Sequence, residues 1–140
     1  MVAPVNVRLH ETTQDRLVRY AHTVGRTRSS VINMAVDEWL RMQAHPRIRF
    51  VTIETGERRA ILADGPAVWT VAEAWLQHEP EDRTVSEMSV VTGLSEAAID
   101  AALAYWADYR EEIDAEVERQ HVAQDEALAA WERRRALDAV

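Results

Sequence analysis

The spacing of hydrophobic residues changes several times along the chain, and each spacing predicts a different element. Residues 4–9 alternate apolar with polar side chains, which is typical of a half-buried strand. Apolar residues then recur every three or four positions over residues 12–24 and 27–43, which predicts two amphipathic helices. Gly25 suits the end of the first helix, and Thr27 suits the N-cap of the second. The side chains expected in the core of this part are Val5, Val7, Leu9, Ile32 and Trp39.

The middle of the chain predicts a hairpin followed by helices. Residues 47–62 have the pattern of two short strands joined by a turn. The next helix is expected to open with Pro66 in its first turn. A capping box begins at Thr84, and Gly93 separates this short helix from another that Ser95 caps. These two helices have helix-turn-helix spacing.

The last stretch, residues 111–140, is helix-prone to its end but carries few apolar side chains. Its apolar stripe consists of Ile113, Val117, Leu128 and Trp131. Because a segment this polar buries little surface by itself, we expect it to stay loose until a partner covers that stripe. The patterns together predict a mainly α protein in three parts, residues 1–43, 44–110 and 111–140.

The charge is divided unevenly between two halves of the chain. The 140 residues have a formal net charge of -8, from 16 basic and 24 acidic side chains. Residues 1–59 carry ten arginines and six acids, which gives +4, whereas residues 60–140 give -12. The front half therefore suits a phosphate-bearing partner, and the acidic remainder does not. A soluble surface with unevenly placed charges is the simpler alternative.

The composition excludes several classes of site. The chain has no cysteine, which rules out disulfides and thiolate metal sites. Its five histidines are scattered, and no catalytic motif or glycine-rich phosphate loop occurs, so we expect no enzyme activity, no cofactor and no metal. No apolar run is long enough to span a bilayer, and the first residues lack the layout of a signal peptide. A cytoplasmic protein without a membrane partner is therefore expected.

The front part of the chain predicts a dimer. One short strand and two helices cannot enclose a core, whereas two copies can pair their strands antiparallel beneath four helices. The sequence VNVRLHETTQDRLVRYAHTVGRTRSSVINMAVDEWL resembles the ribbon-helix-helix DNA-binding family, which includes the Arc, MetJ and CopG repressors. The likeness covers residues 4–42 and rests on Asn6-Val7-Arg8-Leu9, Gly25-Arg26-Thr27 and Ser29-Ser30. His10 departs from the pattern, since many members have proline there.

The resemblance implies a homodimer whose two-stranded ribbon enters the major groove of operator DNA. Asn6 and Arg8 would face the bases, because asparagine can bridge the polar edges of adenine and arginine those of guanine, while Pro4 would contribute only shape. The start of the second helix would hold a phosphate through its N–H groups and through Arg26, Arg28, Ser29 and Ser30. The alternative is that these are ordinary polar side chains of a solvated surface.

The region that follows is similar to a small homeodomain-like domain of antitoxins in the VapB group, which are paired with PIN-type ribonuclease toxins. The shared marks are a hairpin before Val68-Trp69, the turn Gly93-Leu94-Ser95, and Ala104-Tyr105-Trp106 followed by Glu111-Glu112-Ile113-Asp114. The helix-turn-helix spacing itself is not expected to read DNA. Its second helix, residues 96–110, carries three acids against one arginine.

The two resemblances together imply the antitoxin of a type II toxin–antitoxin pair, which represses its own operon and inhibits a cognate toxin, a ribonuclease. The toxin would bind Ile113, Val117, Leu128, Trp131, Arg133, Arg134 and Arg135. Trp131 would be the hot spot, and an arginine would enter the carboxylate-lined metal site of the toxin. Three alternatives stay open: a solvated helix end or coiled-coil arm for the last segment, a stand-alone repressor that senses a small ligand, and an interaction protein whose ribbon only dimerises.

Overall fold

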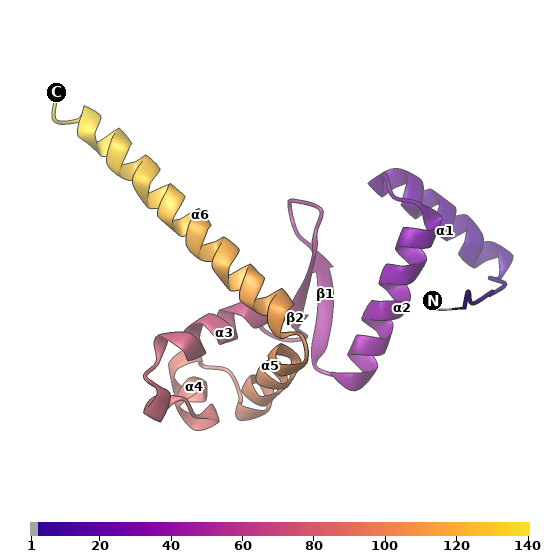
Figure 1. Cartoon of the computed structure of the whole chain (residues 1–140), viewed down its shortest axis with the longest axis horizontal. Coiled ribbons are helices and arrows are strands. Elements are labelled where there is room, and N and C mark those ends of the chain that lie inside the picture. Colours follow the sequence, from indigo (N-terminus) through magenta and orange to yellow (C-terminus); the bar gives the residue numbers. More distant parts are fainter. Residues whose placement is uncertain (1–2) are drawn as a thin grey trace. The chain divides into compact units, whose positions relative to one another are not determined.

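The computed structural model describes residues 3–140. The chain divides into two compact units, one ending at Gln43 and the other beginning at Ala44. The first, here the N-terminal unit, consists of an extended segment and two helices (Figure 1). The second, the C-terminal unit, combines a two-stranded sheet with the remaining helices. The structure is therefore mainly α, as the sequence predicts.

Local signals define the helices of the N-terminal unit. Helix α1 spans Glu11–Val24 and α2 spans Arg28–Ala44. Gly25 ends α1 in the left-handed conformation with φ 68°, as expected for a residue without a side chain. The Thr27 hydroxyl accepts a hydrogen bond from the backbone N–H of Ser30 at 3.1 Å, which confirms the predicted cap. Residues 3–10 form no strand within the chain, so the ribbon between two copies stays a prediction.

The predicted hairpin is confirmed in the C-terminal unit. Strand β1 (Ile48–Thr52) pairs antiparallel with β2 (Arg58–Leu62). Helix α3 (Val68–Gln77) begins later than the sequence predicts. Pro66 precedes the helix because its carbonyl oxygen accepts a hydrogen bond from the N–H of Leu62 at 3.0 Å, which continues the strand pairing instead.

Two short helices follow α3, with a 3-10 turn before them. The turn η1 is Pro80–Asp82, and helices α4 and α5 are Val85–Thr92 and Glu96–Asp108. The predicted caps are confirmed, since the Thr84 hydroxyl accepts from the N–H of Glu87 and the Ser95 hydroxyl from that of Ala98, both at 3.1 Å. Gly93 turns the chain between the helices with φ 75°.

The core of the C-terminal unit lies where α3, α5 and the start of α6 pack on the hairpin (Figure 1). One face of the sheet is covered, because the register places buried Ile48 opposite buried Leu62. Burial of each such large side chain contributes about 1.5–3 kcal/mol. Helix α6 (Arg110–Leu137) then continues well beyond the core. Ile113 and Val117 in its first two turns belong to the core, which therefore extends past residue 110, and no residue of α6 after Val117 is buried.

Candidate nucleic-acid interface and partner surface

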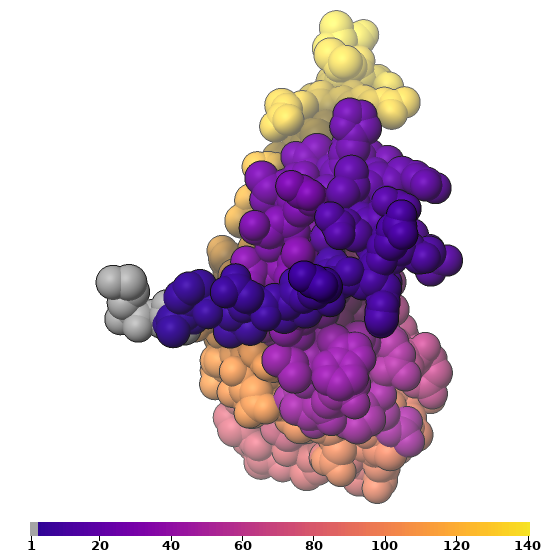
Figure 2. Space-filling view, turned by 90° about the vertical axis from the view of Figure 1, so that its right-hand side faces the viewer, coloured from indigo at the N-terminus to yellow at the C-terminus, as the bar shows by residue number. Residues whose placement is uncertain are grey.

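The N-terminal segment is exposed on both of its sides. Residues 3–8 are all exposed, and the segment runs as an extended strip (indigo in Figure 2). In extended backbone successive side chains point to opposite sides, which separates Val5 and Val7 from Asn6 and Arg8. The two valines are 84% and 74% exposed, although the sequence predicts them in a core. One chain alone therefore has nothing that covers the apolar side of this segment.

The two helices of the N-terminal unit also bury few apolar side chains. Among residues 3–43, the buried apolar side chains are Ala21 and Val31. Ile32 and Trp39, both predicted to be core, are 41% and 57% exposed. Further exposed apolar side chains are Val18, Tyr20, Val24, Val36 and Leu40. So much uncovered apolar surface on a unit this small is typical of a face that another chain covers.

The structure brings three of the predicted DNA contacts together. A hollow of about 480 Å³ in the N-terminal unit is lined in part by Arg8, Arg28 and Ser29. The backbone N–H groups of the latter two belong to the first turn of α2, where a helix leaves its donors without an intrahelical acceptor. Two guanidinium groups beside such a helix end suit a phosphate.

The other predicted DNA contacts lie outside that hollow. Pro4 and Asn6 are exposed on the extended segment. The Arg26 guanidinium donates to the Met34 sulfur at 3.1 Å, and the N–H of Ser30 is already used by the Thr27 cap. One chain by itself therefore does not gather these four side chains into the hollow that Arg8, Arg28 and Ser29 line.

The predicted toxin-binding residues divide into two groups. Ile113 and Val117 are 0% and 5% exposed, because α3 packs against the first turns of α6, so these two residues are core and not a partner surface. Leu128 and Trp131 are both 54% exposed. The structure therefore corrects the predicted surface and leaves only its distal half accessible.

The distal half of α6 carries an aromatic ring beside several arginines. The Arg135 guanidinium lies 5.1 Å from the centroid of the Trp131 ring. Arg134 and Arg135 line a hollow of about 450 Å³ together with Trp131 and Asp138, and Arg133 is exposed on the same helix. Tryptophan and arginine are the side chains most enriched at binding hot spots, so this end of α6 has the composition of a partner surface.

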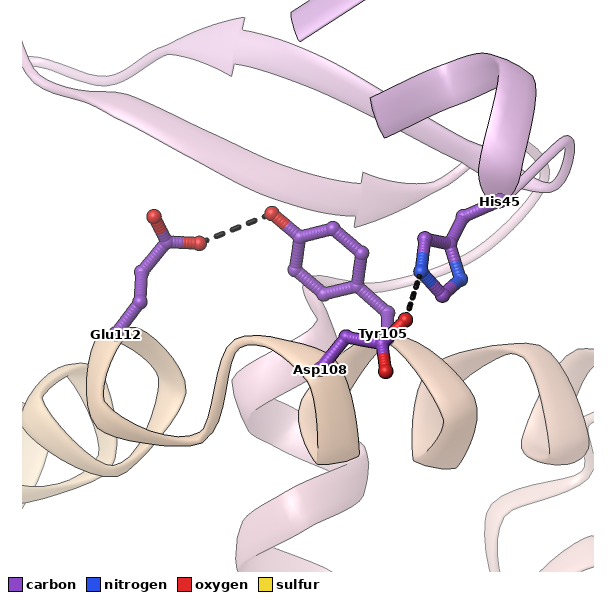
Figure 3. Close-up of polar contacts among 4 residues, drawn as sticks. All are labelled: His45, Tyr105, Asp108 and Glu112. Atoms are coloured by element: carbon purple, nitrogen blue, oxygen red, sulfur yellow. Dashed lines mark hydrogen bonds and ion pairs between the residues drawn. The ribbon is translucent and has the colours of Figure 1, made fainter. Parts of the chain in front are cut away.

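Sequence reasoning missed two polar contacts in the C-terminal unit (Figure 3). The Nε2 atom of His45 lies 2.8 Å from a carboxylate oxygen of Asp108, and the Tyr105 hydroxyl donates to Glu112 at 3.0 Å. The His45 ring also meets the edge of the Tyr105 ring, with centroids 5.2 Å apart. Partners 63 positions apart leave no local signal, so no pattern in the sequence could have paired His45 with Asp108.

A buried carboxylate beside the hairpin is a second feature that the sequence did not indicate. Glu116 on α6 is 4% exposed, and one of its oxygens lies 3.6 Å from the Arg59 Nε atom. Burial raises the pKa of Glu116 above its ordinary value of 4.5, because loss of water penalises the charged form by more than the Arg59 charge favours it. The native chain therefore holds this proton more tightly than the unfolded chain.

Glu116→Gln is expected to remove a pH dependence of stability. Since the native pKa is raised, the contribution of Glu116 is fully present below 4.5 and declines as pH rises through the raised pKa. Glutamine imitates the protonated group, so the variant should gain stability over the native protein as pH approaches neutrality. Urea unfolding across this pH range, with Glu118→Gln as the exposed control, measures the effect. A variant that is less stable than the native protein at neutral pH would contradict it.

Among the described residues there is neither a cluster of metal ligands nor a membrane-spanning helix. No cluster of three or more histidine, aspartate or glutamate side chains within residues 3–140 is arranged to hold a metal ion. Across the same residues, none of the helices combines the length and the apolar character needed to cross a membrane.

Comparison of the chain with models of protein families, with curated proteins and with solved structures gives no match. Functional inference for this chain therefore comes from its own residues: the uncovered apolar face of the N-terminal unit, the arginines beside α2, and the distal part of α6.

Proposed function

We propose that this protein is the antitoxin of a type II toxin–antitoxin pair, which dimerises through its N-terminal unit, represses its own operon and inhibits a cognate ribonuclease toxin. The observation that carries the proposal is the uncovered apolar face of the N-terminal unit. Val5, Val7, Ile32 and Trp39 recur at core spacing, yet all are exposed in one chain. A second copy that pairs its strand antiparallel with the first would cover them.

The opposite side of the same segment supports the DNA-binding half of the proposal. A paired ribbon would present Asn6 and Arg8 from each subunit, and a two-stranded ribbon fits the major groove. The hollow beside Arg28 and Ser29 would receive a backbone phosphate. A regulator of this kind acts in the cytoplasm, needs no cofactor, and has operator DNA and the toxin as its partners.

The distal part of α6 supports the toxin-binding half. A helix that leaves its own core with Leu128 and Trp131 exposed resembles the helix-in-groove mode of recognition, in which a few apolar side chains fill pockets of the partner. The neighbouring Arg133, Arg134 and Arg135 would meet an acidic site on the toxin. Because DNA binding and toxin binding are linked in one chain, repression would depend on the toxin. A toxin bound to α6 would bridge dimers on adjacent operator half-sites and so strengthen their binding to DNA.

Trp39→Glu is expected to convert a dimer into a monomer, because the charge would be buried at the interface between two copies. Sedimentation of the full-length protein at several concentrations measures the change. Val90→Glu is the matched control, since Val90 is 78% exposed on α4 of the C-terminal unit, and it should leave the dimer intact. A native protein that sediments as a monomer, or a Trp39→Glu variant that stays dimeric, would overturn the dimer.

A further inference from the structure

A second hollow lies in the C-terminal unit, between the end of α3, Arg83 and the junction of α5 with α6. It has a volume of about 280 Å³, close to the lower end of ligand pockets, which hold about 300–1,000 Å³. Its walls are mostly apolar and come from Trp75, Leu76, Leu103, Trp106 and Ala107. Arg83 and Arg110 complete the lining. An apolar hollow with two guanidinium groups favours a ligand that has both an apolar body and a negative charge.

Arg83 is held in place by the backbone. Its Nε atom donates to the carbonyl oxygens of Trp75 and His78, each at 3.0 Å, and its Nη2 atom donates to that of Leu76 at 3.3 Å. The acids that precede it in the chain are Glu79, Glu81 and Asp82, yet within residues 3–140 none of them forms an ion pair with Arg83. A fixed positive charge therefore lies at the hollow without a carboxylate in contact.

Arg110 is held by a different arrangement. Its Nε atom donates to one carboxylate oxygen of Asp114 at 2.9 Å, and its guanidinium lies 5.2 Å from the centroid of the Trp106 ring. The Trp106 indole donates to the other oxygen of Asp114 at 2.8 Å. Asp114 therefore balances the charge of Arg110, whereas Arg83 contacts only backbone carbonyl oxygens, so one positive charge at the hollow has no carboxylate beside it.

We propose that this hollow binds a small monocarboxylate with a flat aromatic or branched aliphatic body. The body would lie against Trp75 and Trp106, where aromatic rings offer large apolar contact area. The carboxylate would meet Arg83 and Arg110, because charge-assisted hydrogen bonds to arginine are the strongest of their kind. This binding is independent of the antitoxin function, since none of these residues belongs to the DNA or toxin surfaces.

Titration of the full-length protein with indole-3-acetate and with isovalerate, followed by calorimetry, tests the proposal. At least one carboxylate should bind, and its neutral amide should bind roughly tenfold more weakly because the amide lacks the charge that arginine recognises. Ala107→Phe would fill the hollow and abolish binding. Ala97→Phe makes the same change at another exposed alanine of α5, outside the lining, and should leave binding intact.

A second pair of variants separates the role of the charge from that of the fold. Arg110→Gln should weaken carboxylate binding about tenfold and leave amide binding unchanged. Arg119→Gln removes the same charge from an exposed position of α6 outside the lining and should have no effect. If neither acid binds, if acid and amide bind equally, or if Ala107→Phe or Arg110→Gln leaves acid binding unchanged, the proposal is overturned.

Discussion

Replacing Asn6 and Arg8 together with alanine is expected to weaken specific binding to DNA upstream of the protein's own gene by about a thousandfold or more. In the proposed dimer two copies contribute four base-facing side chains, and each base contact is worth about 1–3 kcal/mol of discrimination. Even the lower limit sums to about 4 kcal/mol, which corresponds to roughly three powers of ten in affinity. Fluorescence anisotropy at a fixed salt concentration measures the loss.

The matched control for this pair is Arg19→Ala with Asn33→Ala. It removes the same two residue types and the same charge from exposed positions on α1 and α2. General attraction to phosphate falls by the same charge in both variants, so only the first should lose preference for the specific sequence. If the Asn6 and Arg8 variant binds the upstream DNA as the native protein does, while remaining dimeric, the ribbon does not read DNA.

Trp131→Ala is expected to weaken the complex with the cognate toxin by roughly thirtyfold or more. An aromatic hot spot contributes about 2 kcal/mol or more, which accounts for that factor. The substitution should not disturb folding, because Trp131 is 54% exposed and lies beyond Val117, the last buried residue of α6. Calorimetry with the protein encoded beside this gene, together with rescue of growth on co-expression, measures the effect.

Val122→Ala is the control for the tryptophan variant. Val122 is 46% exposed on the same helix, but nine residues from Trp131 and about 180° around the helix axis. It should bind and rescue as the native chain does. If Trp131→Ala still neutralises the toxin at the native dose, the distal part of α6 is not the toxin-binding surface, and the DNA-binding proposal is unaffected.

The helices of this chain could be predicted from local signals. Gly25, Thr27, Thr84 and Ser95 each act on backbone groups within four residues, so the sequence alone places them at helix ends. The sequence predicts Pro66 inside the helix, which is wrong because its carbonyl oxygen pairs with a strand residue, and strand pairing depends on which segments meet in space.

The partner surfaces could be predicted only in part. Ile113 and Leu128 belong to the same apolar stripe, and nothing in the spacing tells which is covered. Only the packing of α3 against the first turns of α6 separates the buried position from the exposed one. The alternation of Val5 with Asn6 predicted two faces for the N-terminal segment, but the cover for its apolar face has to come from another chain.

The continuity of α6 fixes the direction in which its distal side chains point. Val117, in the core, and Trp131, outside it, are two heptads apart on one unbroken helix. The two side chains therefore point to nearly the same side of the helix, about 40° apart around its axis, and are separated by about 21 Å along it. One residue inserted between them would rotate Trp131 by about 100° while every core contact remained. An insertion of seven or eleven residues would instead rotate Trp131 by only about 20°. The exposed part of α6 therefore tolerates a change in length of seven or eleven residues far better than a change of one, if Trp131 is to keep facing the same side.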